Sequence, residues 1–100
     1  MSIWRVAPVN EVPSITLRDW KIYEIENGIS RHAVGYDINN YQGYVSSRIA
    51  TFDYENKRFI SRSGRVILLK GAPGFDNDAQ YVWSTWKKLN KVTQVREIIV

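Results

Sequence analysis

The sequence contains no cysteine and only one histidine, His32, among its 100 residues. The absence of thiols excludes disulfide bonds, thiolate metal sites and cysteine catalysis. A metal site of ordinary affinity needs three or four imidazole, thiolate or carboxylate ligands. One histidine and scattered acids do not supply such a set, so we expect no metal and no cofactor.

Long apolar runs are also missing. No stretch approaches the roughly 18 apolar residues that a membrane-spanning helix requires, and the first residues contain no apolar segment of signal-peptide length. The lack of cysteine agrees with a reducing compartment. We therefore expect a cytoplasmic protein that binds no membrane.

Motifs of common catalytic and nucleotide-binding sites are absent as well. No G-x-S-x-G elbow accompanies His32, and the ten acids are spread among expected turns and helix caps. The segment GAPG at 71–74 precedes an expected helix but lacks both the G-K-[ST] of a P-loop and the dinucleotide fingerprint. Asp76 and Asp78 would repel an anion at that helix terminus. We expect a protein without enzymatic activity.

The sequence contains enough apolar residues to form a hydrophobic core, since 44% of the residues are hydrophobic and 13% are aromatic. A chain of this size and composition is typical of one globular domain over 1–100. Residues 1–13 carry two prolines and little periodicity, which indicates an irregular arm. Turn signals then recur through 14–70, which is typical of an antiparallel β-meander.

Asn27-Gly28 is the strongest hairpin signal, because both residues tolerate the positive φ of a type I′ turn. A two-residue loop there places Glu24 opposite Arg31, a favourable cross-strand pair. The same register places Glu26 opposite Ile29, Tyr23 opposite His32, Ile22 opposite Ala33 and Trp20 opposite Gly35. Further turns are expected at 39–43, 53–56 and Ser63-Gly64, with strands at 44–52, 59–61 and 66–69.

A capped amphipathic helix is predicted over 77–90. Asn77 and Gln80 have the spacing of a capping box. A β-branched strand over 92–99 follows. The apolar stripe of the helix contains Ala79, Val82, Trp83, Trp86 and Leu89.

The sequence thus predicts an α+β fold in which an antiparallel β-meander of five to six strands forms a curved sheet. One C-terminal amphipathic helix packs on one face of this sheet, and a short final strand follows the helix.

One segment, 57–70, is strongly basic, with five cations and no acid, whereas the whole chain has a net charge of +4. A Ser63-Gly64 turn would place Arg62 directly opposite Arg65, which is unfavourable. One interpretation is a solvated hairpin neutralised by Asp53, Glu55 or Glu97 from a neighbouring strand. The other is an anion or partner site. Its candidate residues are Lys57, Arg58, Arg62 and Arg65.

The pattern RSGR at 62–65, LKGAPG at 69–74 and DAQYVW at 78–83 resembles small uncharacterised proteins of bacteria and their phages or mobile elements. The resemblance covers about the C-terminal third of the chain. It implies a bacterial or phage setting, and it implies no activity and no functional residue.

For function, the sequence favours a small non-catalytic binding module that acts on a protein partner or forms a homodimer. The alternative is binding of nucleic acid or another polyanion through the basic hairpin 57–70.

Overall fold

The computed structural model describes residues 12–99, so all of the predicted arm except Val12 and Pro13 lies outside the described residues. Residues 12–99 form seven strands, one helix and a short 3₁₀ turn. In chain order they are β1 (Ser14–Ile25), η1 (Glu26–Gly28), β2 (Ser30–Asp37), β3 (Gln42–Val45), β4 (Ile49–Asp53), β5 (Arg58–Ser61), β6 (Val66–Leu69), α1 (Asn77–Leu89) and β7 (Val95–Ile98).

The strands form one mixed sheet in the order β3-β2-β1-β6-β5-β4, with β7 paired to β1 beside that path. The α+β class is confirmed, but the purely antiparallel meander is wrong because β6 runs parallel to β1. The predicted strand over 44–52 is in fact two strands. β3 pairs with β2 at one end of the sheet, and β4 pairs with β5 at the other end.

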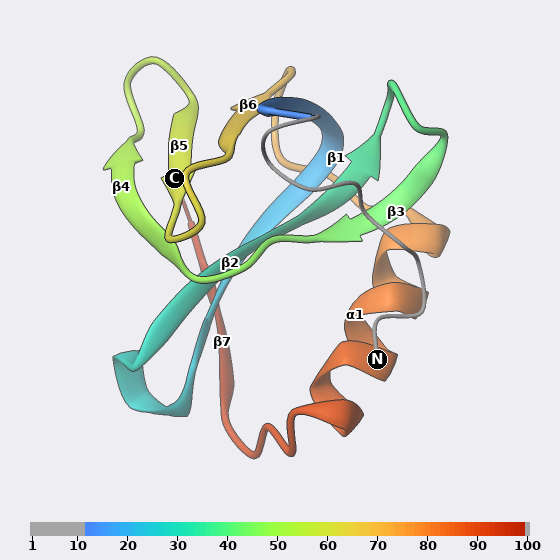
Figure 1. Cartoon of the computed structure of the whole chain (residues 1–100). Coiled ribbons are helices and arrows are strands. Elements are labelled where there is room, and N and C mark those ends of the chain that lie inside the picture. Colours follow the sequence, from blue (N-terminus) through green and yellow to red (C-terminus); the bar gives the residue numbers. More distant parts are fainter. Residues whose placement is uncertain (1–11, 100) are drawn as a thin grey trace.

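The sheet is strongly curved (Figure 1). Although three strands separate β4 from β2 in the sheet, the two strands contact each other. The concave side therefore encloses the larger hydrophobic core. This core consists of Ile15, Leu17, Trp20, Ile22, Ala33, Tyr44, Ile49, Phe59, Ile67 and Leu69.

Helix α1 packs on the opposite face of the sheet, against β3 and β2, as Figure 1 shows. Trp83 is buried there and stacks on Tyr23 with 4.8 Å between ring centroids. The predicted apolar stripe is confirmed except at Leu89, which is exposed. The N-cap is Asp76, which accepts from the Ala79 N–H at 2.9 Å, so the capping box predicted at Asn77 is wrong by one residue.

The β1–β2 hairpin has most of the predicted register. Glu24 pairs with Arg31, and the pairs of Ile22 with Ala33 and Tyr23 with His32 are also present. The predicted pair of Glu26 with Ile29 is absent, because a four-residue loop closes between Ile25 and Ser30. The Glu26 carboxylate instead accepts hydrogen bonds from the Thr93 and Gln94 N–H groups before β7.

A bulge interrupts β1 between Arg18 and Lys21. Asp19 has φ 49°, in the left-handed region. Asp19 and Trp20 together oppose Gly35, so the predicted one-to-one pair of Trp20 with Gly35 is not formed. The extra residue turns Trp20 toward the concave core.

Strand β1 pairs with other strands along both of its edges, and two strands pair with different parts of one edge. β2 covers one edge, while β6 pairs with residues 14–17 and β7 with residues 22–25 of the other edge. β6 is parallel and β7 antiparallel to β1, so their last residues approach each other from opposite directions. The bulge at 18–21 lies between them.

Candidate functional site

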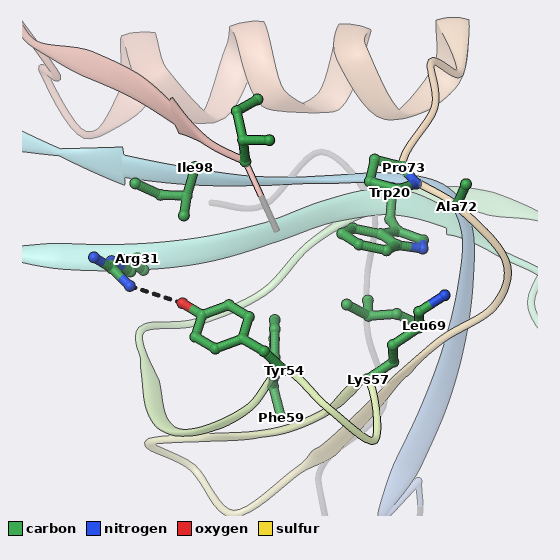
Figure 2. Close-up of a pocket in the computed structure, with 10 residues that line it drawn as sticks. Trp20, Arg31, Tyr54, Lys57, Phe59, Leu69, Ala72, Pro73 and Ile98 are labelled. Atoms are coloured by element: carbon green, nitrogen blue, oxygen red, sulfur yellow. Dashed lines mark hydrogen bonds between the residues drawn. The ribbon is translucent and has the colours of Figure 1, made fainter.

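A cleft of about 460 Å³ opens on the concave side, where the ends of β6 and β7 approach each other across the β1 bulge (Figure 2). Clefts of roughly 300–1,000 Å³ are the usual size for binding sites. The lining is mainly apolar. Its apolar members are Trp20, Phe59, Leu69, Ala72, Pro73, Ile98 and Ile99.

Trp20 forms a fixed part of the cleft wall. Its indole is buried, and Nε1–H donates to the Gly71 carbonyl at 3.2 Å. The ammonium of Lys57 donates to the same carbonyl at 3.0 Å. These two bonds hold the segment after β6 against β1 and β5, so the cleft has a defined shape instead of an open gap between loops.

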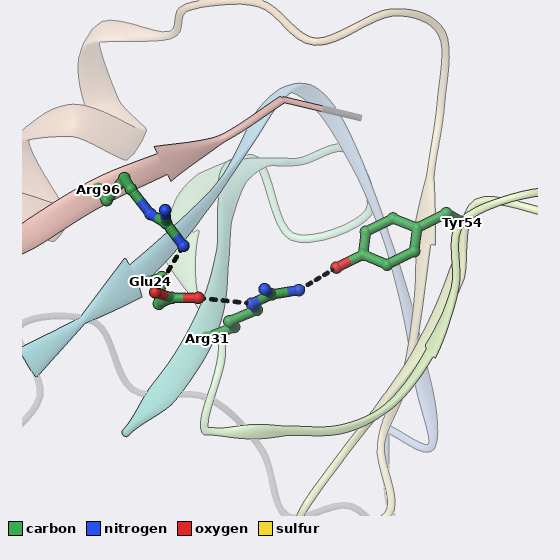
Figure 3. Close-up of polar contacts among 4 residues, drawn as sticks. All are labelled: Glu24, Arg31, Tyr54 and Arg96. Carbon is green, nitrogen blue, oxygen red and sulfur yellow. Dashed lines mark hydrogen bonds and ion pairs between the residues drawn. The ribbon is translucent and has the colours of Figure 1, made fainter. Parts of the chain in front are cut away.

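The polar side of the cleft is a chain of contacts centred on Arg31 (Figure 3). Arg31 Nε donates to Glu24 Oε2 at 3.0 Å, and Arg31 Nη1 donates to the Tyr54 hydroxyl at 2.7 Å. The other Glu24 oxygen accepts from Arg96 Nη2 at 2.8 Å. The chain links β1, β2 and β7 with the turn after β4.

This network fixes the charge state of Glu24. The hydrogen bond from Arg31, helped by the charge of Arg96, lowers the pKa of the Glu24 carboxyl below its usual value. Glu24 is therefore ionised at neutral pH and holds the Arg31 guanidinium in one orientation. A guanidinium fixed in this way presents its remaining N–H groups without further loss of side-chain entropy.

Cations, and no acid, line the cleft among residues 12–99. Arg31 and Lys57 border it, whereas Glu24 contacts Arg31 but does not line the cleft. Within that part of the chain, Nη2 of Arg31 has no hydrogen-bond partner, and the side chain is 31% exposed. The cleft thus combines apolar walls with N–H donors that remain available to an anionic group.

His32 lies away from the cleft, beneath α1. Its ring sits 4.6 Å from that of Trp86. The Ser46 carbonyl only accepts, so Nδ1–H donates to it at 2.9 Å, and Nε2 accepts from the Ser30 hydroxyl at 2.8 Å. Burial lowers the pKa of His32, so the ring is neutral at pH 7. These contacts give the histidine a structural role.

Three of the four predicted anion-site residues are exposed, and the fourth, Arg65, is not. Lys57 borders the cleft, while Arg58 and Arg62 are exposed elsewhere, on β5 and in the turn after it. Arg65 is buried, and it donates to the Val12 carbonyl and the Tyr44 hydroxyl.

The predicted Arg62–Arg65 pair is wrong, because the turn contains three residues. The Arg65 carbonyl accepts from the Ser61 N–H. Arg58 is instead the Cα partner of Asp53, the first of the acids expected to neutralise this hairpin. Hydrogen bonds from Asn56 lower the pKa of Asp53, and the charge of Arg58 adds to this effect.

Sequence reasoning missed Trp20, Arg31 and Tyr54 as site residues. The Glu24–Arg31 pair was predicted from the Asn27-Gly28 turn, but as a sheet pair only. The cleft depends on β6 and β7 sharing one edge of β1, and no local signal in the sequence gives that pairing.

No protein-family model matches the chain, and comparisons with curated proteins and with solved structures also find no match. In residues 12–99 no three His, Asp or Glu side chains lie together in a way that could hold a metal ion. Over the same residues, no helix has the length and apolar character needed to cross a membrane.

Proposed function

We propose that this protein is a non-catalytic binding module that holds a protein partner by taking an apolar side chain of that partner into the cleft between β6 and β7. The observation that carries the proposal is the cleft itself. Its apolar walls enclose about 460 Å³, and its polar lining groups are donors suited to fixing a ligand's orientation.

The rim of the cleft favours a protein over a small molecule. Ile99, which borders the cleft, is 83% exposed, so apolar surface extends from the lining to the rim. Among the described residues, the edge of β7 away from β1 pairs with no strand. Exposed apolar residues beside an open strand edge are typical of surfaces that bind another chain.

The polyanion alternative has less support. Of its four candidate residues, Arg65 is buried and Lys57 borders the cleft, so only Arg58 and Arg62 are exposed away from it. The apolar cleft therefore supports protein binding better than polyanion binding.

Selection from a random twelve-residue peptide library displayed on phage, with the purified protein as bait, tests the proposal. Ala72→Phe places a ring at the cleft wall on an exposed position, so it blocks the cleft without opening the core. Ala50→Phe is the matched control, because Ala50 is also exposed and does not line the cleft.

We expect the selected peptides to bind the wild type and Ala50→Phe equally, and to lose about 10-fold or more in affinity for Ala72→Phe, as the loss of a buried apolar contact predicts. Equal affinity for all three proteins, or no selected peptide, would overturn the proposal.

A further inference from the structure

We infer that the partner segment carries an Asp or Glu side chain next to the apolar residue that enters the cleft, and that Nη2 of Arg31 binds this carboxylate. The inference rests on the proposed function, which it extends by naming the chemistry of the partner. It follows from the charges that border the cleft and from the way Arg31 is held.

The groups that border the cleft carry a net positive charge. Arg31 and Lys57 border the cleft, no acid of residues 12–99 lines it, and Arg96 lies on the far side of Glu24. Glu24 is shared between Arg31 and Arg96, so one carboxylate faces two guanidinium groups. The polar side of the cleft therefore keeps an excess of positive charge, which an anionic group in the partner would balance.

The guanidinium of Arg31 is held in one orientation. Glu24 occupies Nε and Tyr54 occupies Nη1, and both bonds are short enough to fix the plane of the guanidinium. Phe52 adds a ring 5.3 Å from Arg31 Cζ. The Nη2 group keeps its donors, so a carboxylate meets a preoriented guanidinium and forms charge-assisted hydrogen bonds.

A carboxylate that reaches Arg31 could come from a side chain or from a chain end. Figure 2 shows Arg31 beside Tyr54 and Ile98, at the side of the apolar lining. Ile99 borders the cleft and is 83% exposed, so the rim offers apolar contact to a partner chain that continues past the buried residue. The inference therefore assigns the carboxylate to a side chain and not to a chain end.

A competing account is that the Glu24–Arg31–Tyr54 contacts only tie the turn after β4 to the first hairpin. The two accounts differ in what removal of the guanidinium changes. Removal of a purely structural tie lowers stability and changes the affinity for acidic and neutral peptides to the same extent. Removal of a binding group lowers the affinity for acidic peptides and leaves the affinity for their neutral counterparts unchanged.

The test uses peptides selected from the random library, each synthesised with its Asp or Glu and with Asn or Gln in its place, and with free or amidated C-termini. Affinities are measured for the wild type, Arg31→Met and Arg31→Lys, and for Lys57→Met as the matched change at the other cation of the cleft.

We expect the acidic peptides to bind the wild type about 10-fold to 100-fold more tightly than their neutral forms, as charge-assisted hydrogen bonds predict. In Arg31→Met, the acidic and neutral forms should bind with equal affinity. Arg31→Lys should keep part of the preference for the acidic form, and Lys57→Met should keep most of it. C-terminal amidation has no effect.

Some peptides could lose affinity for Ala72→Phe and yet bind the wild type equally in their acidic and neutral forms. This result would overturn the inference and leave the proposed function standing. The same holds if amidation, and not the Asp or Glu change, abolishes binding. Loss of affinity to the same extent for both peptide forms in Arg31→Met would also overturn it, because that is the result of a structural tie. A library that yields no peptide sensitive to Ala72→Phe would overturn both proposals.

Discussion

Leu17 and Trp20 lie on the same face of β1 although they are three positions apart along the strand. Both belong to the concave core, whereas the alternation of a regular strand would place them on opposite faces. The bulge at Asp19 makes this possible by adding one residue to β1 opposite Gly35. Without it, Trp20 would point toward the face that α1 covers, and the cleft would lose its wall.

The first prediction concerns Asp19, whose φ is 49°. Asp and Asn tolerate the left-handed region, whereas a β-branched residue does not. Asp19→Val should lower the unfolding free energy by about 1–2 kcal/mol, and Asp19→Asn should change it by less than about 0.5 kcal/mol. Urea denaturation measures both values. Equal stability of the two variants would show that the bulge does not require this backbone conformation.

The second prediction compares two tryptophans on α1. Trp83 is fully buried against Tyr23, so Trp83→Ala should cost about 3–5 kcal/mol. Trp86 is only partly buried, beside His32, and Trp86→Ala should cost clearly less. Denaturation followed by circular dichroism gives the comparison. A larger loss at Trp86 would mean that the helix packs through a different part of its surface.

The third prediction separates two arginines of the basic hairpin. Arg65→Met removes the donors to the Val12 carbonyl and the Tyr44 hydroxyl in the interior. We expect a loss of about 1–3 kcal/mol in unfolding free energy. Arg62 is exposed, so Arg62→Met should stay within about 0.5 kcal/mol of the wild type. Thermal or urea unfolding of the matched pair decides the point, and a neutral Arg65→Met would contradict the structural role.

The fourth prediction concerns pH. Burial lowers the pKa of His32, so the unfolded chain takes up a proton at a higher pH than the folded protein does. The contribution of His32 to the unfolding free energy is fully present above the unfolded-state pKa of about 6.5. It decreases as the pH falls below that value, by at most about 1.4 kcal/mol per pH unit.

The measurement is the unfolding free energy between pH 7.5 and 5. Glu24 and Glu26 have pKa values below 4.5, so their contributions are lost only at lower pH and do not overlap this window. His32→Gln should remove the slope. A wild type with constant stability over this range, or the same slope in the variant, would contradict the buried neutral histidine.

Local signals predicted the parts of the fold that depend on neighbouring residues. The Asn27-Gly28 turn gave the Glu24–Arg31 register, and the spacing of Ala79, Val82 and Trp83 gave the buried face of the helix. Non-local pairing was not predictable in this way. The 44–52 segment reads as one strand, yet the chain leaves the β2 edge after Val45 and re-enters the sheet at Ile49.

The candidate site shows the same limit. Lys57 was singled out for its charge, but its role at the cleft depends on the parallel pairing of β6 with β1, which joins residues about 50 positions apart. Arg65 was singled out for the same charge, although it lies in the interior. Side-chain type alone could not distinguish a cation that borders a cleft from one that supports a core.

The most direct test of the central claim is the indole N–H resonance of Trp20 in ¹⁵N-labelled protein, because this group forms the cleft wall and bonds Gly71. On addition of a selected peptide, we expect this resonance to shift saturably in the wild type and Ala50→Phe, and to stay unchanged in Ala72→Phe. The indole resonance of Trp83, beneath the helix, should not move. A peptide that binds the wild type while the Trp20 resonance remains in place would contradict the assignment of the cleft as the binding site.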